Sequence, residues 1–194
     1  MRVSDTLAFA AGPWRIERVL ADHRSGTQGR FTGRATLTEP APGSATPGAP
    51  QPSGEPPRTG EPPPSGGPPP SGEPPRGEPG EPGPYDPGPH RPGPELCYLE
   101  TGELRFGTHT GPATRTLRYQ GRPDGTVDVR FADGHFFYRL DLRSGRCVAV
   151  HQCRADRYEI TYLALSENAM EERWQVQGPG KDYEATATLV RWDH

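Results

Sequence analysis

The sequence predicts an all-β domain, an antiparallel up-and-down β-barrel of about ten strands with a short N-terminal helix. Three observations lead to this fold class. Apolar and polar residues alternate with period two along most segments, turn residues separate these segments at short intervals, and no helical segment is long enough to connect parallel strands. A sheet of about ten strands curls or splits, and closure removes both exposed edges, which favours a barrel over a two-sheet sandwich.

A proline-rich tract over residues 40–94 interrupts the pattern. It holds 22 of the 26 prolines and 12 of the 25 glycines, so it has too few apolar side chains to collapse and too many prolines to pair in a sheet. We expect a disordered loop insertion here, within a single β-barrel domain formed by residues 1–39 and 95–194. A solvated loop with no role of its own and a proline-rich docking segment both stay open for the tract.

The first elements follow in order from the N-terminus. Ser4 or Asp5 caps a short helix over residues 6–11, which the following Gly-Pro pair ends. A first strand covers residues 14–20, and a second strand, after a hairpin loop with a Ser-Gly pair, covers residues 30–38.

The segments after the tract continue the alternation. Residues 96–100 lead through a Thr101-Gly102 turn into residues 104–106, which predicts another hairpin. Glycine-containing turns at residues 123–125, 132–134 and 144–145 separate several of the remaining strands. These strands are expected at residues 114–120, 126–131, 135–142, 146–153, 158–165, 172–177 and 183–192.

Charge and composition exclude several classes of protein. The net charge is −3, all of it in the tract, and the remaining residues are neutral overall. A nucleic-acid surface needs clustered basic residues, so no nucleic-acid partner is expected. The sequence has no run of 18 apolar residues and no apolar signal-peptide region, so we expect no membrane span and a cytoplasmic protein. The three cysteines lack CxxC spacing, which argues against a disulfide framework or a zinc ribbon.

One candidate site lies in the segment from His151 to Tyr158. Residues two apart on a strand share a face, so His151 and Cys153 lie on the side of Cys147, opposite two valines. If the valines point outward, His151 points into the barrel; if they form the core, His151 is exposed. A metal site with Asp156, a cysteine nucleophile and a hydrogen-bonded barrel histidine are the alternatives, and no metal site is expected because four ligands are not evident.

A second candidate site lies in the segment from Gly178 to Tyr183. It contains Lys181, the only lysine in a chain with 21 arginines. This choice indicates a position that uses a compact ammonium, which a planar guanidinium cannot replace in every role. The segment differs from a phosphate-binding loop in its glycine spacing and has Asp182 in place of Ser or Thr. We interpret it as a tight turn that places Lys181, Asp182 and Tyr183 at the rim of the barrel.

Other polar and aromatic residues are candidates for the interior. Arg115, Arg118 and Tyr119 are expected to face the same interior as the two candidate sites. The three tryptophans are expected in the core or at a barrel end.

Several groups of residues together resemble a known family. They are Gly12-Pro13-Trp14 with Arg18, Phe31-Thr32-Gly33-Arg34-Ala35, Tyr98-Leu99-Glu100-Thr101-Gly102, Leu117-Arg118-Tyr119, Phe131-Ala132-Asp133-Gly134, His151 with Cys153, Asp156 and Tyr158, Trp174-Gln175-Val176, and Gly178-Pro179 with Lys181-Asp182-Tyr183. With these residues the chain resembles the domain of unknown function 6314 family. The resemblance implies a calycin-like or lipocalin-like β-barrel and no established activity.

Three functions are compatible with these residues. The leading hypothesis is a barrel that binds a small molecule, an anion included, in its interior. Its candidate ligand contacts are His151, Cys153, Asp156, Tyr158, Lys181, Asp182, Tyr183, Arg118 and Tyr119. The second hypothesis is an enzyme with His151 as general acid or base, helped by Lys181 and Arg118. The third is an interaction module that uses the tract or forms a homodimer through a barrel face. The sequence identifies no cofactor.

Overall fold

The computed structural model describes residues 1–40 and 93–192, and this part of the chain contains one helix and ten strands. The elements are α1 (Thr6–Ala10), β1 (Gly12–Asp22), β2 (Thr27–Thr38), β3 (Glu95–Phe106), β4 (His109–Gly121), β5 (Val127–Phe131), β6 (Phe136–Leu140), β7 (Arg146–Cys153), β8 (Asp156–Ser166), β9 (Ala169–Gln177) and β10 (Asp182–Arg191). The expectations for the tract concern residues of which 41–92 lie outside the described part of the chain.

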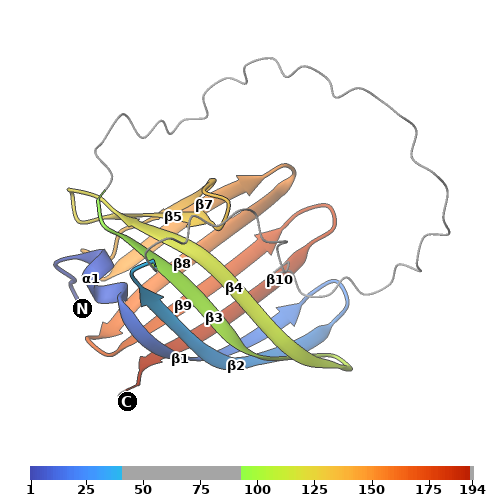
Figure 1. Cartoon of the computed structure of the whole chain (residues 1–194). Helices are drawn as coiled ribbons and strands as arrows, with labels where there is room; N and C mark the ends of the chain where they lie inside the picture. Colours follow the sequence, from blue (N-terminus) through green and yellow to red (C-terminus); the bar gives the residue numbers. More distant parts are fainter. Residues whose placement is uncertain (41–92, 193–194) are drawn as a thin grey trace, which may run out of the picture. The chain divides into compact units, whose positions relative to one another are not determined.

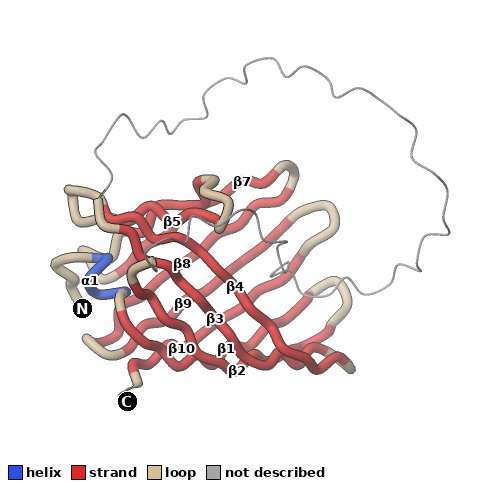
Figure 2. Tube along the Cα trace, in the orientation of Figure 1, coloured by secondary structure: helices blue, strands red, loops and turns tan. Residues whose placement is uncertain are grey.

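The ten strands form one antiparallel sheet that closes on itself almost completely (Figures 1 and 2). The strand order is β6-β5-β4-β3-β2-β1-β10-β9-β8-β7, so the chain runs up and down around a barrel in which β1 pairs with β10. The predicted fold class, an all-β up-and-down barrel of about ten strands with a short N-terminal helix, is therefore confirmed.

The two end strands of the sheet, β6 and β7, meet at a seam that side chains bridge. The backbone N–H of Asp141 lies 3.4 Å from Sγ of Cys147, and this sulfur lies 3.7 Å from the carbonyl oxygen of Arg139. The ring of Phe137 packs edge-on against His151, with 4.8 Å between the ring centres. Side-chain packing thus holds the seam where the sheet ends.

One predicted hairpin is wrong, because β3 runs without a break through Thr101 and Gly102. Gly102 pairs with Gly33 of β2, and the ring of Phe31 lies over both glycines. A Cβ on Gly33 or Gly102 would lie 2.6 or 2.7 Å from Cζ of this ring, closer than real Cβ atoms come. The glycine that suggested a turn therefore serves a close approach between strands.

The helix α1 closes one end of the barrel (Figure 1). As predicted, Asp5 caps it, since its carboxylate accepts a hydrogen bond of 2.9 Å from the backbone N–H of Ala8. The indole of Trp14 donates to the carbonyl of Ala10 at 2.8 Å, and the Thr6 hydroxyl accepts from the backbone of Leu142 at 3.1 Å. These buried contacts join the helix to the strand ends. The helix is too short to span a membrane, and it is the only helix of the described residues.

The side chains of β7 show which face of this strand points inward. Val148 and Val150 are 43% and 52% exposed, whereas Cys147 and Ala149, which alternate with them, are buried. His151 shares the face of Cys147 and Ala149, so it points into the barrel. The structure thus selects one of the two orientations that the sequence left open.

The end opposite α1 carries no helix of the described residues. Five hairpin connections surround it, and the inward-facing residues near it differ in burial: Leu20, Leu104 and Trp174 are half-buried, whereas Phe106 and Val176 are buried. We call this end the open end of the barrel.

Candidate functional site

Four charged side chains meet in the interior of the barrel. Arg18 of β1 donates two hydrogen bonds to the Glu100 carboxylate, at 2.7 and 3.0 Å, and one to Glu172 of β9 at 3.0 Å. Arg115 of β4 donates to Glu100 at 3.0 Å and lies 3.6 Å from Glu172. Two positive and two negative charges thus balance inside one cluster. We call these four residues the interior ion network.

Tyrosine hydroxyls complete the hydrogen bonding of the network. Tyr98 donates to Glu100, and Tyr162 donates to Glu172 at 2.6 Å. Tyr138 lies 2.7 Å from the Tyr162 oxygen and donates to it, because the Tyr162 proton is already used. Burial raises the pKa of all three phenols, so they stay protonated as donors.

Each charged group of the network favours the ionised form of its oppositely charged partners. Burial acts to raise the pKa of Glu100 and Glu172, but Arg115 and Arg18 hold both values below the ordinary one. Burial and Arg115 act to lower the pKa of Arg18, and the two carboxylates raise it above its ordinary value. All four groups are therefore charged at neutral pH.

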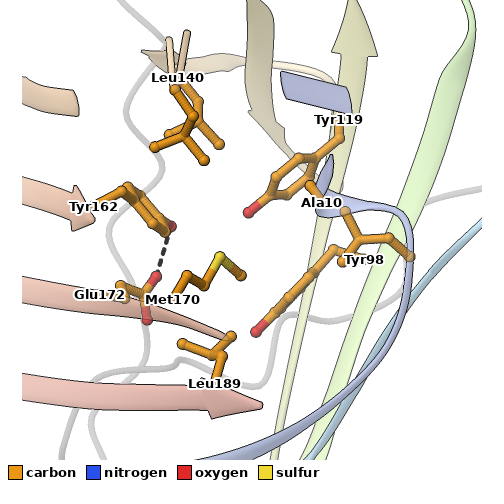
Figure 3. Close-up of a pocket in the computed structure, with 10 residues that line it drawn as sticks. Ala10, Tyr98, Tyr119, Leu140, Tyr162, Met170, Glu172 and Leu189 are labelled. Carbon is orange, nitrogen blue, oxygen red and sulfur yellow. Dashed lines mark hydrogen bonds between the residues drawn. The ribbon is translucent and has the colours of Figure 1, made fainter. Parts of the chain in front are cut away.

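A small cavity separates the network from α1. It measures about 10 Å³, the room for about one water molecule. The hydroxyls of Tyr98 and Tyr119 point toward it from one side, and Tyr162 with Glu172 lie on the other side (Figure 3). Burial raises the pKa of Tyr119 to about 12. The barrel between the network and the closed end is thus filled with side chains.

The two arginines of the network use their donors differently. Arg18 directs both terminal nitrogens to the carboxylates. Arg115 makes its network contacts through Nη2 alone, and its buried Nε has no acceptor among the described residues. The Arg115 side chain is 20% exposed, against 11% for Arg18. Arg115 is therefore the arginine of the network that is more open to solvent.

Aromatic rings continue from Arg115 toward the open end. The guanidinium lies 5.3 Å from the ring centre of Trp174, which is 5.7 Å from Phe137. Phe137 also contacts Phe131 at 4.3 Å and His151 at 4.8 Å. His151 lies 6.0 Å from the ring of Tyr158. We call Arg115, Phe131, Phe137, His151, Tyr158, Trp174 and Lys181 together the mouth.

Lys181 completes the mouth through Tyr158 and Asp156. Its ammonium donates to the Tyr158 hydroxyl at 2.7 Å and pairs with Asp156 at 2.9 Å, and the lysine and aspartate side chains are each 21% exposed. The turn that carries Lys181 has backbone hydrogen bonds in both directions between Gly178 and Lys181, so it is a tight turn as predicted. A Cβ on Gly178 would fall on the Asp156 carboxylate. Glycine at this position therefore lets Asp156 reach the lysine.

His151 lies between the seam and Tyr158. Burial lowers its pKa, although a hydrogen bond with the backbone of Phe137 acts in the opposite direction. The imidazole is therefore neutral at pH 7 and able to accept a proton. Since Tyr158 contacts both His151 and Lys181, the imidazole and the ammonium lie on the same wall of the barrel.

Comparison with known proteins identifies the family. A family model described as a family of unknown function (DUF6314) matches residues 84–191, more than half of the chain. The chain belongs to the DUF6314 family. A search of curated protein sequences gave no match to this DUF6314 protein.

Solved structures resemble this DUF6314 protein in fold. The S-type phycobiliprotein lyase CpeS from Guillardia theta superposes with a TM-score of 0.61 at 10% identity, over 100% of this chain and 94% of the lyase. A redesigned β-barrel, mFAP1, bound to DFHBI, has a TM-score of 0.38 at 12% identity and covers 97% of this chain and 100% of its own. At such identities the likeness to the lyase concerns the fold alone, a lipocalin-like barrel.

The other candidate residues of the DUF6314 protein lie apart from the mouth or at its edge. Arg118 was expected inside but lies on the outer face, 3.2 Å from Glu95, because it alternates with Leu117 and Tyr119. Tyr119 faces the interior at the closed end. Cys153 is exposed at the end of β7.

Two further candidates begin the last strand. Tyr183 is half-buried on the inward face of β10, the face of the buried alanines at 185 and 187. Asp182 lies on the opposite face of that strand, and its carbonyl oxygen accepts from the backbone of His23 at 2.8 Å. Within the described ranges, no three His, Cys, Asp or Glu side chains gather to hold a metal ion.

The sequence interpretation missed most of the interior ion network. Of its members, only Arg115 was expected inside as a polar group. A signal was present, because Arg18 shares the strand face of Trp14 and Ile16, and Glu100 shares the face of Tyr98. A charged residue on an otherwise apolar strand face has to be paired when it is buried.

Proposed function

We propose that this DUF6314 protein binds a small molecule at the open end of its barrel. The observation that carries the proposal is the mouth itself, a continuous wall of rings that are half-buried except for the buried Phe137, and that ends on Arg115 at one side and Lys181 at the other. Sites for small molecules in proteins are mostly apolar and aromatic, with a few placed polar groups. The mouth has this composition.

The mouth fits a ligand better than the closed part of the barrel does. The cavity below the network has room for about one water molecule, and the residues around it are buried. The interior ion network then forms a rigid floor, because each of its carboxylates is held by two arginines and a tyrosine. A ligand would lie on this floor and against the rings.

Native mass spectrometry of protein purified from its own host tests the proposal. We expect a retained molecule of defined mass, and we expect the Phe131→Ala variant to lose it because the ring wall is shortened. Val150→Ala is the matched control, since that side chain is on the outer face. Absence of any retained mass, together with no thermal shift in a panel of small molecules, would contradict the proposal.

A second candidate function is acid-base chemistry on the same ligand. The observation in its favour is that a neutral imidazole and an ammonium-bound phenol, His151 and Tyr158 with Lys181, share one wall of the mouth. The ligand from the host would then be converted to a product of different mass on incubation. If His151→Gln converts it at the unchanged rate, His151 is not the general base.

A further inference from the structure

We propose that the ligand of the mouth is a flat, conjugated carboxylic acid, and that Arg115 and Trp174 bind its carboxylate. This inference rests on the proposed function, since it names the chemical class that the same site takes. It comes from two donors that have no acceptor among the described residues.

Arg115 has donors left after its contacts with the network. Its three contacts, with Tyr98, Glu100 and Glu172, all use Nη2, so Nη1 and Nε are not engaged in them. Nε is buried and has no acceptor within residues 1–40 and 93–192. A guanidinium pairs best with a carboxylate, because two parallel N–H groups match its two oxygens.

Trp174 offers a second donor beside the first. Its indole N–H is buried and likewise lacks an acceptor in the described part of the chain. The Arg115 guanidinium lies 5.3 Å from the centre of this indole. Buried donors are normally paired, so two unpaired donors on adjacent side chains indicate an acceptor that comes from a ligand.

The hydrogen bonds of the network leave donors for an added carboxylate. Arg18 alone donates three hydrogen bonds to the two glutamates. Arg115 contacts both of them through Nη2 and keeps its buried Nε for a third carboxylate. The rings next to it supply the other half of the site. Phe137 lies 5.7 Å from Trp174 and is itself buried, but Phe131, which stacks on it at 4.3 Å, is half-buried and can stack on a flat ring of a ligand.

The test uses the full chain labelled with nitrogen-15 and two matched probes, 2-naphthoate and its neutral amide, 2-naphthamide. The chain has three tryptophans, and the indole signal that Trp174→Phe removes is the signal of Trp174. We expect that signal to shift in a saturable way with naphthoate. We expect naphthamide to bind about tenfold more weakly, because a charge-assisted hydrogen bond is about twice as strong as a neutral one.

Three variants and a third probe separate the parts of the site. Trp174→Phe keeps an aromatic ring and loses the N–H donor. Arg115→Lys keeps the positive charge and loses the pair of parallel N–H donors. Each variant is expected to bind naphthoate about tenfold more weakly. Trp192→Phe is the control and leaves the affinity unchanged. Cyclohexanecarboxylate, which is not flat, is expected to bind more weakly than naphthoate. Circular dichroism establishes that each variant is folded.

The outcomes distinguish this inference from the proposed function. Equal affinity for naphthoate and naphthamide, or a Trp174 signal that neither probe moves, overturns the carboxylate assignment. If the protein from its host also retains a molecule that is not an acid, the assignment is wrong and the proposed function stands. If the host protein retains nothing and no probe binds, both are wrong.

Discussion

The two ends of the barrel are built from different residues. At the closed end, α1 covers a layer of buried apolar side chains such as Trp14, Leu140 and Leu142, each 2% exposed or less. At the open end, aromatic and basic residues, most of them half-buried, form the mouth, and the lysine there pairs with a carboxylate that is itself partly exposed. The interior ion network separates the two regions.

This difference indicates that different parts of one sheet provide stability and position the site. Apolar burial at the closed end contributes about 25 cal/mol for each Å² removed from water, independent of direction. The network contributes little net stability, because the cost of burying charges offsets their attraction. Its value is in orientation, since Tyr98 and Glu100 of β3 and Glu172 of β9 fix Arg115 below the mouth.

Removal of one network carboxylate is expected to have the largest effect on stability. Glu172→Gln leaves the two arginines with one carboxylate between them, and breaking a buried ion pair costs about 3–5 kcal/mol. Urea unfolding followed by circular dichroism measures this loss. Glu103→Gln is the control, because its pair with Arg105 is exposed and is expected to matter little. A loss as small as that of the control would show that the network is not a coupled unit.

Leucine truncations at the two ends sharpen the comparison. Leu142→Ala at the closed end removes a fully buried side chain and is expected to cost about 2–5 kcal/mol. Leu104→Ala at the open end removes a half-buried one, so its cost is expected to be about 1 kcal/mol. The difference in unfolding free energy is read from the same urea curves. Equal costs would mean that the open end is packed as tightly as the closed end.

Acid is expected to unfold the protein through the network. The pKa values of Glu100 and Glu172 are held below the ordinary value of 4.5. In the unfolded chain these carboxyls take up protons as the pH falls through about 4.5, while the folded protein resists, so stability present above that pH is lost below it. Unfolding free energies measured between pH 7 and pH 3 give the slope. In Glu172→Gln the slope should be shallower, and an unchanged slope would place the acid-sensitive groups elsewhere.

The sequence predicts which side chains share a strand face, but it does not predict which side chains of other strands they meet across the barrel. Period two already placed Arg18 with Trp14 and Ile16, so its inward direction was available before the structure. Its partner Glu172 is 154 positions away in the sequence, and their meeting depends on how the sheet closes. Gly102 was misread for a related reason, since a glycine permits both a turn and a close approach, and only the pairing with Gly33 decides.

The smallest expected effect concerns the turn at the mouth. In Gly178→Ala the added Cβ falls on the Asp156 carboxylate, which must move away from Lys181. Both side chains of this pair are partly exposed, so the loss of stability is expected to be below about 1 kcal/mol. The ammonium, however, loses a partner that holds it, so its reaction with acetic anhydride should become faster. Lys181 is the only lysine, which makes its labelled peptide unambiguous by mass spectrometry.

Gly180→Ala is the matched control, because a Cβ there meets no atom of the described chain within 4 Å. If both variants label at the rate of the unmodified protein, Asp156 does not restrain the lysine, and the order at this side of the mouth comes from Tyr158 alone.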